Sequence, residues 1–499
     1  MQTDRFDLVI RQARIFDGTG GSPFVADLAI AGDRIARVGA SLESGGVEID
    51  AHGLALAPGF IDVHSHDDAA VFIAPGMEFK TMQGVTTDIV GNCGLGAAPF
   101  AAARRLFLDF NPKTKIPAWE DYAGYFKALE QEPPSLNVAV LAGHGTIRAA
   151  AMGNERRAPD TGEMAEMRAA LREALTAGVV GMSTGLIYEP GRYAATEEII
   201  ELAREMKGTR AIYTSHMRNE ASGLLDSIRE TMRIGTEAGV PVQVSHHKAS
   251  GRENWGKVRE SLRLIDEARA GGLDATADQY PYTSGSTVLA AVLQNNALNE
   301  RGRSGGIGTL EPEKILLAST PRHPEYEGRT IAQMTELFGL SAEAAAQRIV
   351  DEEGAGAFVV LESMDENDVR TVMRHPTTMI GSDGIMAGSK PHPRLYGTFP
   401  RVIGHYARDL GLMSIEEAIH RMTGMPARKF GLADRGVVRA GAFADLVIFD
   451  LAEFADVGTY ADPCRYPQGV RYVFVNGRAV VSEGRHTGVR PGRALRRQD

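Results

Sequence analysis

The feature that most constrains this fold is an alternation of short apolar runs and helical patterns across residues 58–435. Segments such as 163–178 and 224–239 lie between these runs and carry apolar residues at helical spacing. The apolar runs are LAPGFIDVHSH, TTDIVGNCG, NVAVLAGHG, AGVVGMSTGL, RAIYTSHM, VPVQVSHH, GLDATADQYPY, AFVVLES and TMIGSDG. Strand–helix alternation predicts parallel βαβ units. About eight core strands with one spare at an edge favour a closed (β/α)8 barrel over an open sheet.

Both ends of the chain carry strand patterns of a different kind. Gly32-Asp33 separates two apolar runs near the start, and Asn476-Gly477 does so near the end. Such dipeptides between apolar runs are typical of β-hairpins. The two ends are therefore predicted to form one small β-sandwich domain, with the middle of the chain inserted into it.

These patterns predict three parts. The small β domain takes residues 1–57 plus 436–499, and the barrel takes 58–435. Within the barrel, residues 288–345 do not follow the strand–helix alternation. This stretch is rich in Gly, Pro and charged residues at its start and has a helical pattern at its end. We predict that this stretch is an insertion beside the barrel, which either covers the site as a lid or lies passively on the surface.

Charge and composition exclude several classes of function. The formal net charge is −10 and the pI is about 5.8, and an acidic surface repels phosphate backbones, so we expect no nucleic-acid partner. We find no run of 18 apolar residues and no signal-peptide pattern at the start, so we expect no membrane association and a cytoplasmic location. Two cysteines cannot form a disulfide framework. The sequence does not set the oligomeric state.

Metal-capable side chains follow the predicted strands at the point where each strand ends. They are His64, His66, Cys93, His144, His216, His246, His247 and Asp383. The carboxyl ends of barrel strands converge on one face, where active sites of this fold lie. Imidazole, thiolate and carboxylate are the ligand types of zinc. Each residue alone is more often structural, so the prediction of a metal site rests on their conjunction. For His144 and His247, site and packing roles stay open.

The ordered motifs resemble a known family. PGFIDVHSHDD (58–68) and the late GSDG are similar to the amidohydrolase superfamily. The resemblance narrows to the N-acyl-D-amino-acid deacylase (D-aminoacylase) group through further motifs across nearly the whole chain. These are TTDIVGNCG, MSTGLIYEPGRYA, YTSHMRNE, QVSHHKASG, DQYPYTSGST and HPRLYGTFPRVIGHYAR. The fourth-strand region has no lysine, which argues against dihydroorotases and hydantoinases with a lysine-bridged metal pair.

The resemblance assigns metal-binding and catalytic roles. It implies one tightly bound Zn²⁺ held by Cys93, His216 and His246, and a second, weaker metal position faced by His64 and His66. Asp383 matches the catalytic aspartate.

The resemblance also assigns substrate contacts. Lys248, Tyr280 and Arg394 match residues that contact the substrate carboxylate, with Tyr282 as plausible a candidate as Tyr280. Ser286 is a further candidate for a hydroxyl contact.

The implied activity is zinc-dependent hydrolysis of the amide bond of small N-acyl-D-amino acids, which gives a carboxylate and a free D-amino acid. The stretch VLAAVLQNN (288–296) lacks the arginine of relatives that prefer acidic substrates, so we expect neutral or hydrophobic side chains. Arg301 and Arg303 keep a preference for acidic substrates open. The motifs are also compatible with an amidohydrolase acting on D-dipeptides or cyclic amides and, outside enzymes, with an inactive assembly module.

Overall fold

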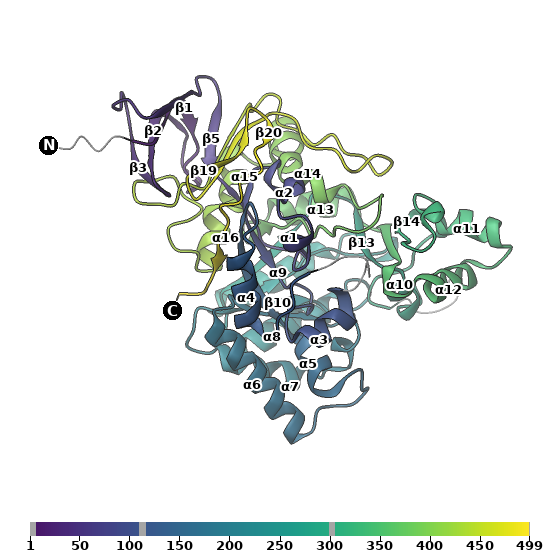
Figure 1. The fold of residues 1–499 in the computed structure, drawn as a ribbon. Helices are drawn as coiled ribbons and strands as arrows, with labels where there is room; N and C mark the ends of the chain where they lie inside the picture. The colour runs from purple at the N-terminus through teal and green to yellow at the C-terminus, as the bar shows by residue number, and fades with distance from the viewer. Residues whose placement is uncertain (1–5, 109–115, 299–304, 499) are drawn as a thin grey trace.

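The computed structural model describes residues 6–108, 116–298 and 305–498, and its central element is a parallel eight-stranded barrel (Figure 1). Neighbouring strands pair in chain order, as expected for successive βαβ units. The barrel strands are β6 (Phe60–Asp62), β7 (Val85–Val90), β8 (Asn137–Gly143), β9 (Gly181–Gly185), β10 (Ile212–His216), β11 (Val242–Val244), β12 (Ala275–Gln279) and β16 (Thr378–Ile380). The predicted barrel is therefore confirmed.

The barrel closes between its first and last strands, β6 and β16. Ser65 and Gly384 form a parallel bridge just beyond the two strands. The backbone N–H of Asp383 donates to the carbonyl of His64 at 2.7 Å. This seam places the residues that follow the first strand directly beside those that follow the last.

Helices surround the barrel and pack against its strands. The longer ones are α4 (Tyr122–Gln131), α5 (His144–Met152), α6 (Thr161–Ala177), α7 (Thr196–Ala203), α8 (Leu224–Ala238), α9 (Val258–Ala270), α13 (Glu366–Arg374), α14 (Arg394–Arg401) and α15 (Ile415–Met422). Helix α6 begins at a capping box between Asp160 and Glu163 and ends at Gly178, which adopts φ 107°. Both features satisfy backbone groups that a helix end leaves unpaired.

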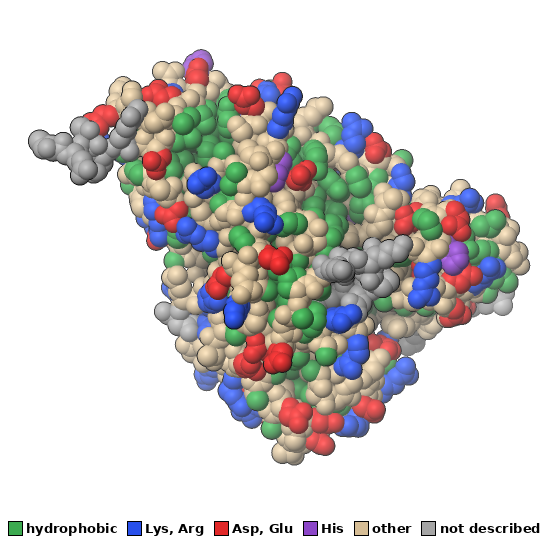
Figure 2. Space-filling view, viewed as in Figure 1, with side chains coloured by type: hydrophobic (Ala, Val, Ile, Leu, Met, Phe, Trp, Pro, Cys, Tyr) green, Lys and Arg blue, Asp and Glu red, His purple; other side chains and the backbone are tan. Residues whose placement is uncertain are grey.

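The surface of the molecule is mixed in charge. Figure 2 shows acidic and basic side chains interspersed over the visible face. Within the three described stretches, none of the helices combines the length and the apolar character that crossing a bilayer requires.

Strands from both ends of the chain join in a second sheet. It contains β1 (Leu8–Ile15), β2 (Phe24–Ala31), β3 (Arg34–Gly39), β4 (Val47–Asp50), β5 (Ala55–Pro58), β17 (Leu446–Phe449), β18 (Val470–Val475), β19 (Arg478–Ser482) and β20 (Arg485–His486). The antiparallel pairing of β17 with β5 connects the two chain ends. The turns Gly32-Asp33 and Asn476-Gly477 connect paired antiparallel strands, as predicted. Both faces of β17 are buried, one in the main core and one in a separate core.

The insertion has a sheet and an apolar core of its own. The sheet is antiparallel, in the order β13 (Ser284–Val288), β15 (Phe358–Glu362), β14 (Ile315–Ser319). Helices α10 (Leu289–Gln294), α11 (Ile331–Phe338) and α12 (Ala342–Glu353) pack on it. The sheet extends beyond both ends of the predicted 288–345.

The expectation of a spare strand at an edge of the barrel was wrong. The run AFVVLES forms β15, the middle strand of the insertion sheet. A buried apolar strand has the same composition in either sheet, so the pattern could not separate them.

A buried lysine lies under the carboxyl ends of the first two strands and the last one. Lys80, on the short helix α2 (Glu78–Thr81), is ion-paired with Asp62, and its Nζ lies 3.1 Å from Asp67 Oδ2 and 3.8 Å from Asp88 Oδ1. It also donates to Ser382 Oγ at 2.8 Å. All four charged side chains are fully buried. One cation thus compensates several carboxylates at the seam of the barrel.

Replacing this cation should therefore destabilise the protein. Removing one partner of a buried ion pair leaves uncompensated charge and typically costs about 3–5 kcal/mol. We expect Lys80→Met to lower the free energy of unfolding by that amount, measured by thermal and chemical denaturation. The exposed Lys127 is the control, and Lys127→Met should change stability by less than about 0.5 kcal/mol. Equal stability of the two variants would contradict a compensating role for Lys80.

Candidate metal centre

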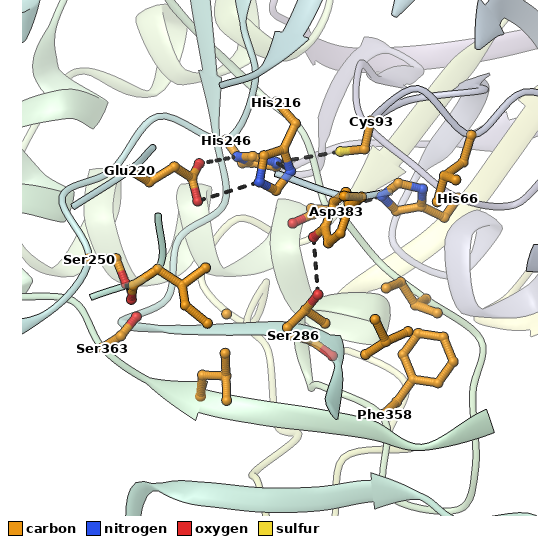
Figure 3. A pocket seen from close by; sticks show the side chains of 18 of the residues that line it. His66, Cys93, His216, Glu220, His246, Ser250, Ser286, Phe358, Ser363 and Asp383 are labelled. Carbon is orange, nitrogen blue, oxygen red and sulfur yellow. Dashed lines mark hydrogen bonds and ion pairs between the residues drawn. The ribbon is translucent and has the colours of Figure 1, made fainter. Parts of the chain in front are cut away.

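Six of the predicted residues form one continuous cluster at the carboxyl ends of the barrel strands, and Figure 3 labels all of them except His64. Cys93 Sγ lies 3.3 Å from His64 Nε2 and 3.5 Å from His246 Nε2. His246 Nε2 lies 2.8 Å from His216 Nδ1. On the other side, Asp383 Oδ1 lies 3.1 Å from His66 Nε2 and 3.5 Å from His64 Nε2. Side chains from five separate strand ends therefore converge on one point.

Backbone strain accompanies this convergence. Cys93, His246 and Asp383 adopt φ values of 54°, 35° and 49°, in the left-handed region that residues with a Cβ rarely occupy. Each lies just beyond the end of a different barrel strand, where the turn directs its side chain into the cluster. Strain of this kind costs of order 1–3 kcal/mol per residue and persists only where the surroundings enforce it.

The cluster favours the ionised forms of its acidic members. Burial alone raises the pKa of the Cys93 thiol, but the adjacent His64 and His216 outweigh it and hold the pKa well below its ordinary value. Burial likewise raises the pKa of Asp383, and Arg394 and His64 outweigh it, so this pKa also falls well below its usual range. A thiolate is the form that binds metal. A carboxylate is the form that accepts a proton.

Two carboxylates beside the cluster were missed from sequence. Asp278 Oδ1, at the end of β12, lies 3.2 Å from His64 Nδ1. Glu220 Oε1 lies 2.9 Å from His246 Nδ1, and Glu220 Oε2 lies 3.7 Å from His216 Nε2. Glu220 follows His216 by four residues, and Asp278 lies at a strand end in the motif DQYPY. The sequence signal for Glu220 and Asp278 was therefore their position, one a helical turn after a candidate ligand and the other at the end of a strand.

Residues predicted to contact substrate lie around a pocket at this face. Lys248, Tyr280 and Ser286 line it, together with five members of the metal-capable cluster. Arg394 does not line it; its side chain is fully buried, with Nη1 2.9 Å from Asp383 Oδ2 and the guanidinium 4.4 Å from the centre of the Tyr280 ring. Tyr282, the alternative to Tyr280, is not a lining residue and donates to Asp456 at 3.4 Å.

The two histidines left open lie away from the pocket. His144 Nε2 lies 2.9 Å from Glu198 Oε1, which also accepts from Arg148. His247 Nε2 lies 2.9 Å from Ser261 Oγ. Both side chains are fully buried, so they are packed, hydrogen-bonded residues rather than pocket residues.

The donor set fits zinc in chemistry and in spacing. With bonds of about 2.0–2.3 Å, tetrahedral zinc ligands lie roughly 3.3–3.8 Å apart. The separations of Cys93 Sγ from His64 and His246 fall in this range. The His216–His246 separation of 2.8 Å would have to widen by about half an ångström. The division into a tight and a weak position remains a prediction.

A (β/α)8 barrel with thiol, imidazole and carboxylate groups gathered at its strand ends defines a metal-dependent hydrolase of the barrel type. The chain belongs to the amidohydrolase family, whose model matches residues 47–481.

Its relatives match over almost their entire length. A D-aminoacylase of Alcaligenes xylosoxydans xylosoxydans is 42% identical, covering 99% of this chain and 98% of the relative. An N-acyl-D-glutamate deacylase of the same organism is 40% identical, covering 99% and 97%. The crystal structure of N-acyl-D-glutamate deacylase from Bordetella bronchiseptica, complexed with zinc and a phosphonate inhibitor, superposes with a TM-score of 0.89 at 39% identity, covering 99% and 100%.

Loss of the thiol should remove the metal. We expect Cys93→Ala to lose bound zinc on extensive dialysis, because a thiolate ligand holds zinc directly. Metal content by plasma mass spectrometry measures this. The matched control is Cys464→Ala, since Cys464 is exposed and belongs neither to the cluster nor to the pocket lining. Retention of a full equivalent of zinc by Cys93→Ala would exclude Cys93 from the tight site.

Proposed function

We propose that this protein is a zinc-dependent hydrolase of N-acyl-D-amino acids that releases a carboxylate and a free D-amino acid. The observation that carries the proposal is one pocket that holds the metal-capable Cys/His cluster, the carboxylate of Asp383 and the ammonium of Lys248. These are the groups needed to bind an amide, activate water and hold a substrate carboxylate. The relatives named for deacylation of D-amino acids support the same conclusion.

Asp383 carries the proton transfers. A bound zinc supplies electrophilic activation of the amide and lowers the pKa of water. Asp383 is held in place by His66 and by Arg394, at 3.1 and 2.9 Å, and is ionised, so it accepts the proton of the attacking water. It then returns that proton to the departing nitrogen, since an amine cannot leave as an anion.

Lys248 and Arg394 are the proposed partners of the substrate carboxylate. Lys248 Nζ reaches the pocket and lies 5.9 Å from the centre of the Tyr280 ring. Arg394 lies against the same ring and holds Asp383 through one nitrogen. Arg394 is fully buried and does not line the pocket, so Lys248 is the cation that faces the substrate directly, and a contact of Arg394 with the substrate carboxylate would require the side chains that cover it to move. Anchoring the carboxylate beside the proton-transfer group fixes which enantiomer presents its amide to the metal.

The substrate side chain is proposed to be neutral or hydrophobic. The insertion forms one wall of the pocket, and its lining there is largely apolar: Val288, Ala290, Ile307, Phe358 and Leu361. Among the residues that the structure describes, no arginine lines the pocket. Arg301 and Arg303 lie outside the described residues. The D-aminoacylase and the N-acyl-D-glutamate deacylase are almost equally similar to this chain, so they do not decide the side-chain preference. The proposal of a neutral or hydrophobic side chain therefore rests on the pocket lining.

A small substrate panel tests activity, enantiomer and side chain together. We expect hydrolysis of N-acetyl-D-leucine and N-acetyl-D-methionine, with kcat/KM at least about tenfold above that for N-acetyl-D-glutamate, because burying an unpaired charge in an apolar pocket is costly. N-acetyl-L-leucine should react far more slowly. Activity on D-dipeptides or hydantoin but not on N-acyl-D-amino acids would replace the proposed function. A preference for N-acetyl-D-glutamate would overturn only the side-chain assignment.

Asp383→Asn tests the proton-transfer role. An amide cannot accept the proton of water, so kcat should fall by about 10²–10⁴-fold. The tightly bound zinc should remain, as metal analysis will show. The exposed carboxylate Asp266 provides the control, and Asp266→Asn should leave kcat unchanged. A variant Asp383→Asn with near-normal turnover would remove Asp383 from the mechanism.

A further inference from the structure

Glu220 contacts the outward faces of two histidines of the metal-capable cluster. Its Oε1 lies 2.9 Å from His246 Nδ1, and its Oε2 lies 3.7 Å from His216 Nε2. The inward nitrogens, His246 Nε2 and His216 Nδ1, are the atoms that face each other at 2.8 Å. In Figure 3, the two rings lie between Glu220 on one side and Cys93 on the other. One carboxylate thus lies behind two candidate ligands.

The backbone fixes this carboxylate in position. The Glu220 N–H donates to the carbonyl of Gly306 at 2.7 Å, and its carbonyl accepts from Ser250 N–H at 2.8 Å. The Glu220 side chain is 3% exposed, so it is almost completely shielded from bulk solvent. The Lys248 ammonium lies 2.6 Å from Glu220 Oε1 and forms an ion pair with it. Glu220 is therefore held as a buried anion.

Lys248 competes with Glu220 for the same histidine. Lys248 Nζ lies 2.6 Å from Glu220 Oε1, 2.8 Å from His246 O and 2.8 Å from His246 Nδ1. An ammonium has donors and no acceptor, so it can bond to Nδ1 only if Nδ1 carries no proton. A neutral imidazole in that form carries its proton on Nε2, the nitrogen that faces Cys93. That tautomer cannot bind metal through Nε2.

We propose that Glu220 is a positioning residue that selects the metal-binding tautomer of His246. Its Oε1 accepts the Nδ1 proton, which leaves the Nε2 lone pair free toward the cluster. Its charge also gives the Lys248 ammonium a carboxylate acceptor at 2.6 Å, so Lys248 can donate there instead of to Nδ1, which lies 2.8 Å away. Its second oxygen lies 3.7 Å from His216 Nε2, too far for a hydrogen bond, so the proposed selection concerns His246 alone. Partners of this kind fix the orientation and basicity of a ligand histidine. The inference rests on the proposed function only in taking zinc as the metal.

Zinc affinity tests this without any substrate. For Glu220→Gln we expect the zinc dissociation constant, measured by chelator competition, to rise about 10–100-fold. The absorption spectrum of the Co²⁺-loaded protein should change as well. The control is Glu198→Gln, since Glu198 is also a buried carboxylate bonded to a histidine, His144, but lies outside the pocket. That variant should keep the zinc affinity and spectrum of the parent. Equal zinc affinity in Glu220→Gln and the parent would overturn the proposal.

Removing Lys248 distinguishes tautomer selection by Glu220 from a purely structural role of Glu220. Glu220→Ala leaves Lys248 free to donate to His246 Nδ1, so zinc should bind more weakly than in the parent. In the double variant Glu220→Ala/Lys248→Met that donor is absent, and zinc affinity should partly recover. Affinity in the double variant no better than in Glu220→Ala would overturn the role assigned to Lys248 competition. Because these readouts need no turnover, failure of the proposed activity would be seen separately, in the substrate panel.

Discussion

The seam between the first and last barrel strands is the constraint on which the site depends. It brings His64 beside Asp383 through a backbone hydrogen bond of 2.7 Å, although more than 300 residues separate them in sequence. Directly beneath, Lys80 ties Asp62 to Ser382, each one or two residues before a member of the cluster. If the barrel opened here, Asp383, the proposed proton-transfer group, would separate from the histidines that follow the first strand.

Above the seam, the cluster concentrates charge in a buried space, and each charge has a compensating neighbour. Asp383 pairs with Arg394, and Glu220 pairs with Lys248. Removing such groups from water is costly unless they are paired, so the arrangement must be enforced by the surrounding structure. The left-handed backbone at Cys93 adds to what the fold has to enforce. Holding these charged groups in fixed positions therefore lowers the stability of the barrel, which is typical of preorganised sites.

The insertion and the barrel together form the walls of the pocket. Residues of β13, α10 and β15 line the pocket opposite the cluster, and Gly306 accepts the backbone hydrogen bond of Glu220. The barrel therefore supplies the metal-capable cluster, and the insertion supplies the wall of the pocket against which we propose that the substrate side chain lies. With this division, substitutions in the insertion can change the substrate preference while the metal-capable residues stay in place. The same holds for other barrel enzymes, in which the loops vary and the barrel does not.

The sequence by itself determined the barrel, the hairpins at both ends and the positions of His64, Cys93 and Asp383 at strand ends, because periodicity and turn residues are local properties. The motifs also indicated the family. Only the tertiary structure decided that β15 belongs to the insertion and that Arg394 faces Asp383 from within the core. It alone placed Glu220 behind two histidines. Pairing and burial depend on which distant segments meet in space, and no local pattern encodes that.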